Sequence, residues 1–182
     1  MNSMTLIDEL IKSTEKIIKQ AEELKNEDIE SLTWKFNKDS WSKLECLKHL
    51  NLYGEFYLPQ IEKKVRESKT SFEVEFKSGV LGNYFSNSML PKEKLNKMKT
   101  FKNKNPLNSH LEKEVIDEFI AQQNALIQLL NYAKTVSLNQ VKIETTLSKW
   151  LKFKLGDAFR FVIFHNIRHM KQIEKIDKFR TV

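Results

Sequence analysis

Apolar residues recur at helical spacing through four long stretches of this chain. They return every three, four or seven positions over about Thr5–Lys25, Ser42–Glu67, Ser109–Lys134 and Ala158–Lys178, as the buried face of an amphipathic helix requires. The 182 residues include 4 Gly and 3 Pro, too few for the many turns of a sandwich or barrel. The sequence therefore predicts an all-α fold, a four-helix bundle with long crossover connections, in a single domain of residues 1–182.

Two of these helices are preceded by a capping-box sequence. Ser42-Lys-Leu-Glu45 and Ser109-His-Leu-Glu112 each place a hydroxyl three residues before a carboxylate, so that each side chain can bond a free backbone N–H at the start of a helix. We therefore expect helices to begin at both places. Pro59 lies inside the second helix, where its missing N–H predicts a kink.

The connections are less regular. Ser71–Phe76 alternates like a short strand but has no evident partner, so we expect it to be extended or a loop. Val80–Leu90 is apolar and is followed by Pro91, which favours a short helix over one end of the bundle. Residues 137–147 read as a second connection, and residues 148–153 as a short turn.

Charge is concentrated in one connection. The net charge is +7, and Pro91–Asn105 holds six lysines against one glutamate. We interpret this segment as a solvated connection; the alternative is a rim that attracts anions such as nucleic acid. Nucleic acid is the weaker alternative, because the segment lacks clustered arginines and a recognisable reading helix.

The remaining composition points to a cytoplasmic protein. The one cysteine, Cys46, cannot form an internal disulfide, and no signal peptide is recognisable at the N-terminus. No apolar run approaches the roughly 20 residues that a transmembrane helix needs. We therefore expect no membrane association.

The four histidines are the candidate metal ligands. His165 and His169 lie four residues apart, which on a helix separates them by about 40° around the axis and about 6 Å along it. Two such rings can converge on one metal ion, although two half-buried histidines are an equally good interpretation. The residues between them do not include the glutamate of an H-E-x-x-H protease motif. His49 lies on a helix with many apolar residues, where an unpaired imidazole is costly to bury, whereas we interpret His110 as a surface residue.

Two segments resemble a known family. Trp41-Ser-Lys-Leu-Glu-Cys-Leu-Lys-His49-Leu resembles the W-S-x-x-E-x-x-x-H-L segment of DinB-like proteins, which include the YfiT-type metalloproteins. His165-Asn-Ile-Arg-His169-Met-Lys-Gln172 is similar to the H-x-x-x-H-x-x-Q segment of their last helix. The resemblance implies a four-helix bundle, often a homodimer, in which His49, His165 and His169 hold a divalent metal, usually zinc or nickel.

The resemblance also implies a class of chemistry. Characterised relatives include S-transferases that use the low-molecular-weight thiols bacillithiol or mycothiol, and a maleylpyruvate isomerase. A bound ion could hold a thiol as thiolate or make hydroxide available from water. The long insert from Ser71 to Asn108 departs from the best-studied relatives, so the sequence does not name the small-molecule substrate.

Several neighbours of the histidines are candidates for supporting roles. Gln172 is expected to hydrogen-bond the fourth ligand, and Glu45 to orient the His49 ring, a role that competes with its helix cap. Tyr53 and Arg168 are candidates to line the pocket and bind the cofactor or an acidic substrate; the alternative, which we favour from the sequence, is packing or a surface ion pair. Cys46 as a fourth ligand is a weaker alternative, because free cysteines in helices are usually small core residues.

Three functions are therefore open. The first is a metal-dependent thiol S-transferase or hydrolase. The second is a helical bundle that binds metal or a ligand without catalysis. The third is a basic protein that associates with nucleic acid.

Overall fold

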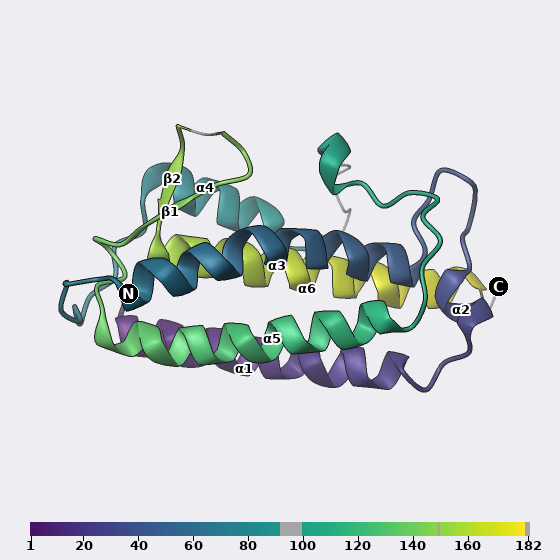
Figure 1. The fold of residues 1–182 in the computed structure, drawn as a ribbon, viewed down its shortest axis with the longest axis horizontal. Helices are drawn as coiled ribbons and strands as arrows, with labels where there is room; N and C mark the ends of the chain where they lie inside the picture. Colours follow the sequence, from purple (N-terminus) through teal and green to yellow (C-terminus); the bar gives the residue numbers. More distant parts are fainter. Residues whose placement is uncertain (92–99, 149, 181–182) are drawn as a thin grey trace.

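Four long helices form the body of the protein in the computed structural model, which describes residues 1–91, 100–148 and 150–180. These helices are α1 (Ser3–Leu24), α3 (Lys43–Arg66), α5 (Glu114–Tyr132) and α6 (Leu155–Arg180). Both α1 and α3 contact α5 and α6, so the four helices close into a bundle. The colours of Figure 1 show that α1 and α6 run in one direction and α3 and α5 in the other. The all-α four-helix bundle predicted from the sequence is confirmed.

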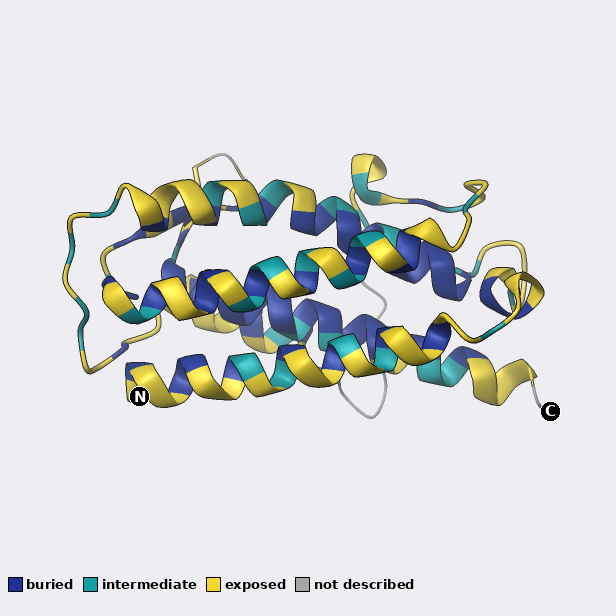
Figure 2. Cartoon of the chain, turned by 60° about the horizontal axis from the view of Figure 1, so that its bottom comes forward, coloured by how far each residue is buried: buried dark blue, intermediate teal, exposed yellow. Residues whose placement is uncertain are grey.

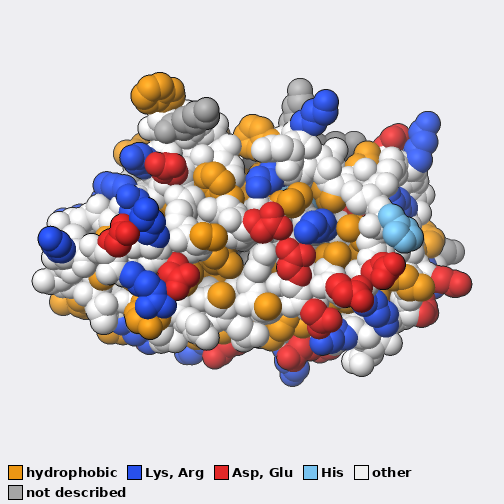
Figure 3. Space-filling view, in the orientation of Figure 1, with side chains coloured by type: hydrophobic (Ala, Val, Ile, Leu, Met, Phe, Trp, Pro, Cys, Tyr) orange, Lys and Arg blue, Asp and Glu red, His pale blue; other side chains and the backbone are white. Residues whose placement is uncertain are grey.

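Helices α1 and α5 each bury one stripe of side chains and expose the opposite stripe, whereas α6 has no exposed residue from Leu155 to Met170 (Figure 2). This pattern follows from the helical spacing of apolar residues, because removal of that stripe from water is the main force that holds the helices together. Fully buried members of the core include Ile7, Leu47, Phe119, Leu130 and Ile163. On the face seen in Figure 3, cationic and anionic side chains are interspersed. Within the described residues, no helix combines the length and the apolar character needed to cross a membrane.

Helix α3 begins as its sequence predicts. The Ser42 hydroxyl accepts a hydrogen bond from the Glu45 backbone N–H at 3.2 Å, and the Glu45 carboxylate accepts one from the Ser42 N–H at 2.8 Å. The capping box is therefore formed. The helix continues through Pro59 to Arg66.

The capping box predicted at Ser109 is wrong. Helix α5 begins at Glu114, and its N-cap, Lys113, makes no side-chain cap hydrogen bond. The Glu112 carboxylate lies 3.7 Å from the exposed His110 ring instead. Asn108, with a positive φ of 62°, donates its backbone N–H to Glu45 on α3. This turn holds the preceding chain against α3, and the helix begins only where Val115 and Ile116 reach the core.

The connection from α3 to α5 spans the length of the bundle, because those two ends lie at opposite ends of the molecule (Figure 1). Its first part is extended, as predicted, and pairs with the chain start: the Ser3 N–H donates to the Val74 carbonyl at 2.8 Å. It then forms α4 (Val80–Met89), the predicted short helix, which packs on α6, and the 3₁₀ turn η1 (Lys102–Lys104). Residues 92–99 of the lysine-rich connection lie outside the described residues.

The connection from α5 to α6 stays at one end of the bundle. After the 3₁₀ turn η2 (Ala133–Thr135) it forms a hairpin of β1 (Lys142–Glu144) and β2 (Lys152–Lys154) with Ile143 opposite Phe153. The side chains of Ile143 and Phe153 are both buried. Their burial determines the face of the hairpin that points inward. The sequence predicted only a connection and a turn here, because each strand is three residues long. A short helix that was also not predicted, α2 (Ile29–Thr33), lies between α1 and α3.

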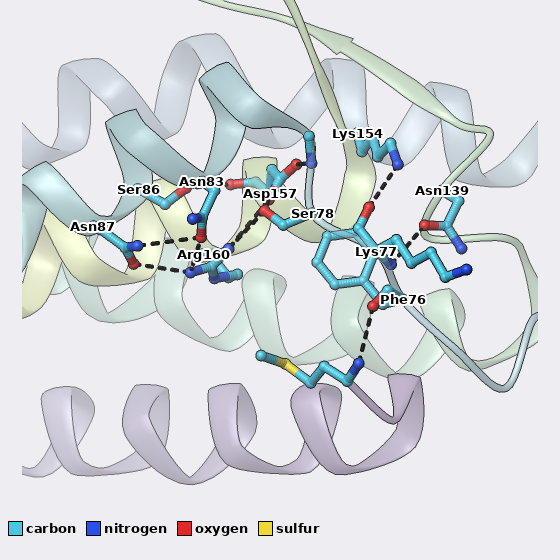
Figure 4. A network of polar contacts seen from close by, with 12 residues as sticks. Phe76, Lys77, Ser78, Asn83, Ser86, Asn87, Asn139, Lys154, Asp157 and Arg160 are labelled. Atoms are coloured by element: carbon cyan, nitrogen blue, oxygen red, sulfur yellow. Dashed lines mark hydrogen bonds and ion pairs between the residues drawn. The ribbon is translucent and has the colours of Figure 1, made fainter.

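A buried polar network joins α4 to the start of α6 (Figure 4). The Asp157 carboxylate, with no exposed surface, accepts hydrogen bonds from the Gly79 N–H at 2.8 Å and from the Ser78 hydroxyl. Arg160 donates to Asp157 at 3.2 Å and to Asn87 at 2.9 Å. Because each charged group has partners, the network can be buried at low cost and holds α4 in place.

The bundle core predicts a clear contrast between two leucine variants. Leu130→Ala removes a side chain with no exposed surface and is expected to lower the free energy of unfolding by about 2–5 kcal/mol, since it leaves a cavity. Leu81→Ala, on α4, truncates a side chain that is 52% exposed and is expected to cost less than about 0.5 kcal/mol. Urea denaturation followed by circular dichroism measures both. Equal losses would contradict this assignment of the core.

Candidate metal centre

Three histidines from two helices meet inside the bundle. His49 comes from α3, and His165 and His169 come from adjacent turns of α6. The Nε2 atom of His165 lies 3.2 Å from Nε2 of His49 and 3.0 Å from Nε2 of His169. All three residues are buried, with at most 7% of their surface exposed. The structure thus brings together the three residues that the sequence proposed as ligands, within 4.8 Å of one another.

The other ring nitrogens define the tautomers of two of these histidines. Nδ1 of His49 lies 2.6 Å from the backbone carbonyl of Lys104, and Nδ1 of His169 lies 3.0 Å from Oε1 of Gln172. Carbonyl and amide oxygens only accept hydrogen bonds, so each Nδ1 must carry the proton. In a neutral ring, Nε2 then presents a lone pair to the centre of the cluster.

The lone pairs cannot all be satisfied within the cluster. Nε2 of His49 and Nε2 of His169 both face Nε2 of His165. That nitrogen carries at most one proton, which can serve one of the two contacts. At least one pair of nitrogens is then left without a hydrogen between them, an arrangement that is costly in a buried place. A cation at the centre would satisfy all three nitrogens.

The spacing of the nitrogens also suits a metal ion. With bonds of 2.0–2.1 Å, two nitrogen ligands of a tetrahedral zinc ion are about 3.3 Å apart. Two of the three separations, at 3.0 and 3.2 Å, are close to this value, and all three ligand atoms lie within 4.8 Å of one another. The residues therefore fit a divalent ion.

Burial keeps the three imidazoles neutral. It lowers the pKa of His49 to about 4, although the hydrogen bond to the Lys104 carbonyl acts in the opposite direction. The pKa values of His165 and His169 also lie well below their usual range, first because of burial and then because of neighbouring charges, including that of Arg168. Neutral rings are the form that binds a metal.

A cavity of about 640 Å³ opens onto the cluster. Its wall is rich in aromatic rings, and the ring centroids of Trp41 and Tyr53 lie 4.7 Å from His49 and 4.5 Å from His165, respectively. Among the described residues, the cationic Arg168 and Lys175 and the acidic Asp39 also line it. In the described part of the chain, the aromatic side chains of the wall are Phe36, Trp41, Tyr53, Phe101, Phe161 and Phe179. The cavity can therefore hold an organic molecule beside the histidines.

The proposed pocket residues are present in this wall, but Gln172 makes a different contact from the one expected. Tyr53, Arg168 and Gln172 all line the cavity. Burial raises the pKa of Tyr53 and lowers that of Arg168, so the Tyr53 phenol stays protonated and can donate a hydrogen bond. Gln172 was expected to bond the fourth ligand, whereas its side-chain oxygen contacts Nδ1 of His169.

Glu45 does not contact the His49 ring that it was expected to orient. Its two oxygens accept hydrogen bonds from the backbone of Ser42 and Asn108 and from Lys35. The cap thus occupies the carboxylate, and the carbonyl of Lys104 takes the position beside His49.

Cys46 and His110 remain outside the cluster. In the part of the chain that the structure describes, the group able to hold a metal consists of the three histidines. Cys46 is fully buried, and burial raises the pKa of its thiol, which disfavours the thiolate that a metal requires. The His110 side chain is 94% exposed, in agreement with its interpretation as a surface residue.

Two functional contacts were missed by sequence reasoning. The first is the contact between His49 and the backbone carbonyl of Lys104, which cannot be recognised from the sequence because every residue has a backbone carbonyl. Trp41 packs against His49 and, at 5.7 Å, against His169. Trp41 is the first residue of the motif that carries the family resemblance, and only this position in the motif could have identified it from the sequence.

Comparison with known protein families gives a match over most of the chain. The family model of the DinB superfamily matches residues 7–173, a range that contains all three clustered histidines. No curated protein and no solved structure matches the chain.

The cluster predicts a specific metal content. Protein prepared without a histidine tag is expected to bind one divalent ion per chain, measured by elemental analysis after equilibration with zinc and gel filtration. His49→Ala is expected to abolish binding because two imidazoles remain, whereas His110→Ala, which changes an exposed ring, is expected to retain it. Equal metal content in both variants would argue against this centre.

The contact of Gln172 with His169 predicts a graded effect on affinity. Gln172→Ala removes the acceptor from Nδ1 of His169 and is expected to weaken zinc binding by about 10–100-fold. Gln172→Glu keeps an acceptor at the same place and should bind at least as tightly as the wild type. Competition with a chromophoric chelator measures both affinities. Unchanged affinity in the alanine variant would show that this contact does not support the ligand.

Proposed function

This chain belongs to the DinB superfamily. We propose that it is a metal-dependent enzyme that either transfers a low-molecular-weight thiol to an electrophile or hydrolyses an electrophile. The single observation that carries this proposal is the convergence of three Nε2 atoms at the wall of a cavity of about 640 Å³. A purely structural cluster would have no need of such a space.

The donor set supports zinc or nickel as the ion. Three neutral imidazoles are ligands that both metals accept. Three protein ligands with no fourth are typical of catalytic zinc sites, which leave one position for water or substrate. When bound, the ion would favour the deprotonated form of a coordinated thiol or water and so supply the nucleophile.

The residues around the ligands have separate roles in this proposal. Lys104 and Gln172 hold the rings of His49 and His169 through their Nδ1 atoms, so both Nε2 atoms stay directed at the ion. Trp41 covers these two rings from one side and limits the access of water. Tyr53, whose ring lies against His165, presents a protonated hydroxyl that can donate to a substrate or thiol.

The cavity wall supports a substrate with an apolar body and an anionic group. Aromatic rings such as those of Phe101 and Phe161 bind apolar or planar molecules by contact and by exclusion of water. Among the described residues, Lys175 and Arg168 are the cationic side chains of this wall and Asp39 is the acidic one. A carboxylate on the thiol or on the electrophile would be attracted to the ammonium group of Lys175.

The nucleic-acid alternative gains less support from the described residues. Lys104, one lysine of the basic connection, turns inward and donates from Nζ to the Leu52 carbonyl at 2.5 Å. The lysines among residues 92–99 lie outside the described part of the chain. We therefore retain the small-molecule function.

The proposal predicts turnover that depends on the same three histidines. Zinc- or nickel-loaded protein is expected to consume a thiol, bacillithiol being the first choice, in the presence of halogenated or epoxide electrophiles, as monitored by mass spectrometry of the conjugate. His165→Ala should abolish turnover, and His110→Ala should preserve it. Release of the hydrolysed electrophile without conjugate would identify the hydrolase instead. Stoichiometric metal without either product over a broad panel would favour a binding protein without catalysis.

A further inference from the structure

Residues 100–108, here called the strap, lie against the metal centre although they belong to the crossover and contain none of its ligands. Thr100 and Phe101 line the cavity. The carbonyl oxygen of Lys104 lies 2.6 Å from Nδ1 of His49. The strap is therefore in contact both with the space for substrate and with one of the ligands.

The local conformation of the strap makes that carbonyl available. Residues Lys102–Lys104 form one 3₁₀ turn, in which the Lys104 N–H donates to the Phe101 carbonyl at 2.9 Å. The carbonyl at the end of such a turn has no partner within the turn. It can therefore accept the Nδ1 proton of His49 without loss of a backbone hydrogen bond.

Further contacts fix the strap along one face of α3. The Asn108 N–H donates to Glu45, one helical turn before His49, at 2.5 Å. The ammonium group of Lys104 donates to the carbonyl of Leu52, about one turn after His49, at 2.5 Å. Contacts at positions 45, 49 and 52 follow the spacing of one helix face, so the strap docks on α3 over two turns with His49 at the middle.

The strap also holds the tryptophan that covers the ligands. Oδ1 of Asn105 accepts a hydrogen bond from Nε1 of Trp41 at 3.1 Å and one from the Leu107 N–H at 3.2 Å. The Trp41 ring in turn packs against His49 and His169. One asparagine thus connects the turn of the strap to the aromatic cover of the metal centre.

We propose that the strap is a positioning element of the metal centre: its docking fixes the ring of His49 as a ligand, and metal binding in turn stabilises the docked strap. The Lys104 carbonyl selects the tautomer of His49 whose Nε2 lone pair faces the other two histidines. Thermodynamic linkage makes the two effects equal: the free energy by which strap docking strengthens metal binding is also the free energy by which metal binding stabilises the docked strap. This inference rests on the metal binding proposed above.

The affinity of strap variants for zinc is the first test. Asn105→Ala removes the acceptor for Trp41, and Lys104→Ala removes the anchor on Leu52; each is expected to raise the dissociation constant for zinc at least about tenfold, the lower limit for an outer contact of a ligand. Asn105→Asp keeps an acceptor oxygen and should restore affinity. Lys102→Ala removes an equal charge from the same turn at an exposed side chain and should bind as the wild type does.

Hydrogen exchange of the full-length wild type is the second test, because it detects docking without reference to activity. Zinc is expected to slow exchange in a peptide that covers residues 101–108 relative to protein treated with EDTA. A peptide from α1 (Ser3–Leu24), none of whose residues lines the cavity, should exchange equally in both states. In Asn105→Ala the zinc-dependent protection of the strap should be lost, while circular dichroism confirms that the bundle is folded.

The outcomes separate this inference from the proposed function. Wild-type affinity in Lys104→Ala and Asn105→Ala, together with zinc-independent exchange of the strap, would overturn the positioning role and leave the metal centre intact. A wild-type protein that binds no divalent ion would overturn both. Weakened zinc binding in the two strap variants, with rescue by Asn105→Asp, would establish the role of the strap.

Discussion

The arrangement of the site depends on three imidazole nitrogens that face one another in a buried place. Two of them carry lone pairs because their rings donate at Nδ1 to Lys104 and Gln172, and the third cannot supply a proton to both. Burial prevents the alternative solution, protonation of the rings, by lowering their pKa values. What remains is a site whose chemistry calls for a cation. The packing of α3 against α6 places the three nitrogens together and so creates a site that needs a cation.

Much of the fold could be predicted from periodicity, and the ligand set from a resemblance. The four long helices follow from apolar spacing, and the start of α3 follows from the Ser42–Glu45 capping box, which the structure contains. The same motif at Ser109 failed because a tertiary contact, from the Asn108 N–H to Glu45, decides the course of the chain there. Short-range sequence patterns cannot contain such a contact. The β1–β2 hairpin was missed for a related reason, since strands of three residues carry too little pattern to recognise.

The outer contacts of the site show a further limit of sequence reasoning. The partner of His49 is a main-chain oxygen, which every amino acid possesses, so no residue type could have identified it. Glu45 was a reasonable candidate from its spacing, but its oxygens are occupied by Ser42, Lys35 and Asn108. Side-chain identity can indicate which groups bind a metal, whereas the path of the backbone decides what supports them.

The two sources of ligands also determine when the centre can form. His49 and His165 are 116 positions apart in the chain, so a growing polypeptide presents the first imidazole long before the other two have been synthesised. An ion that met this early segment would find a single nitrogen, too weak a hold to persist. The proposed ion could therefore be acquired only once α6 has joined α3, and its retention would report that the bundle has reached its native topology.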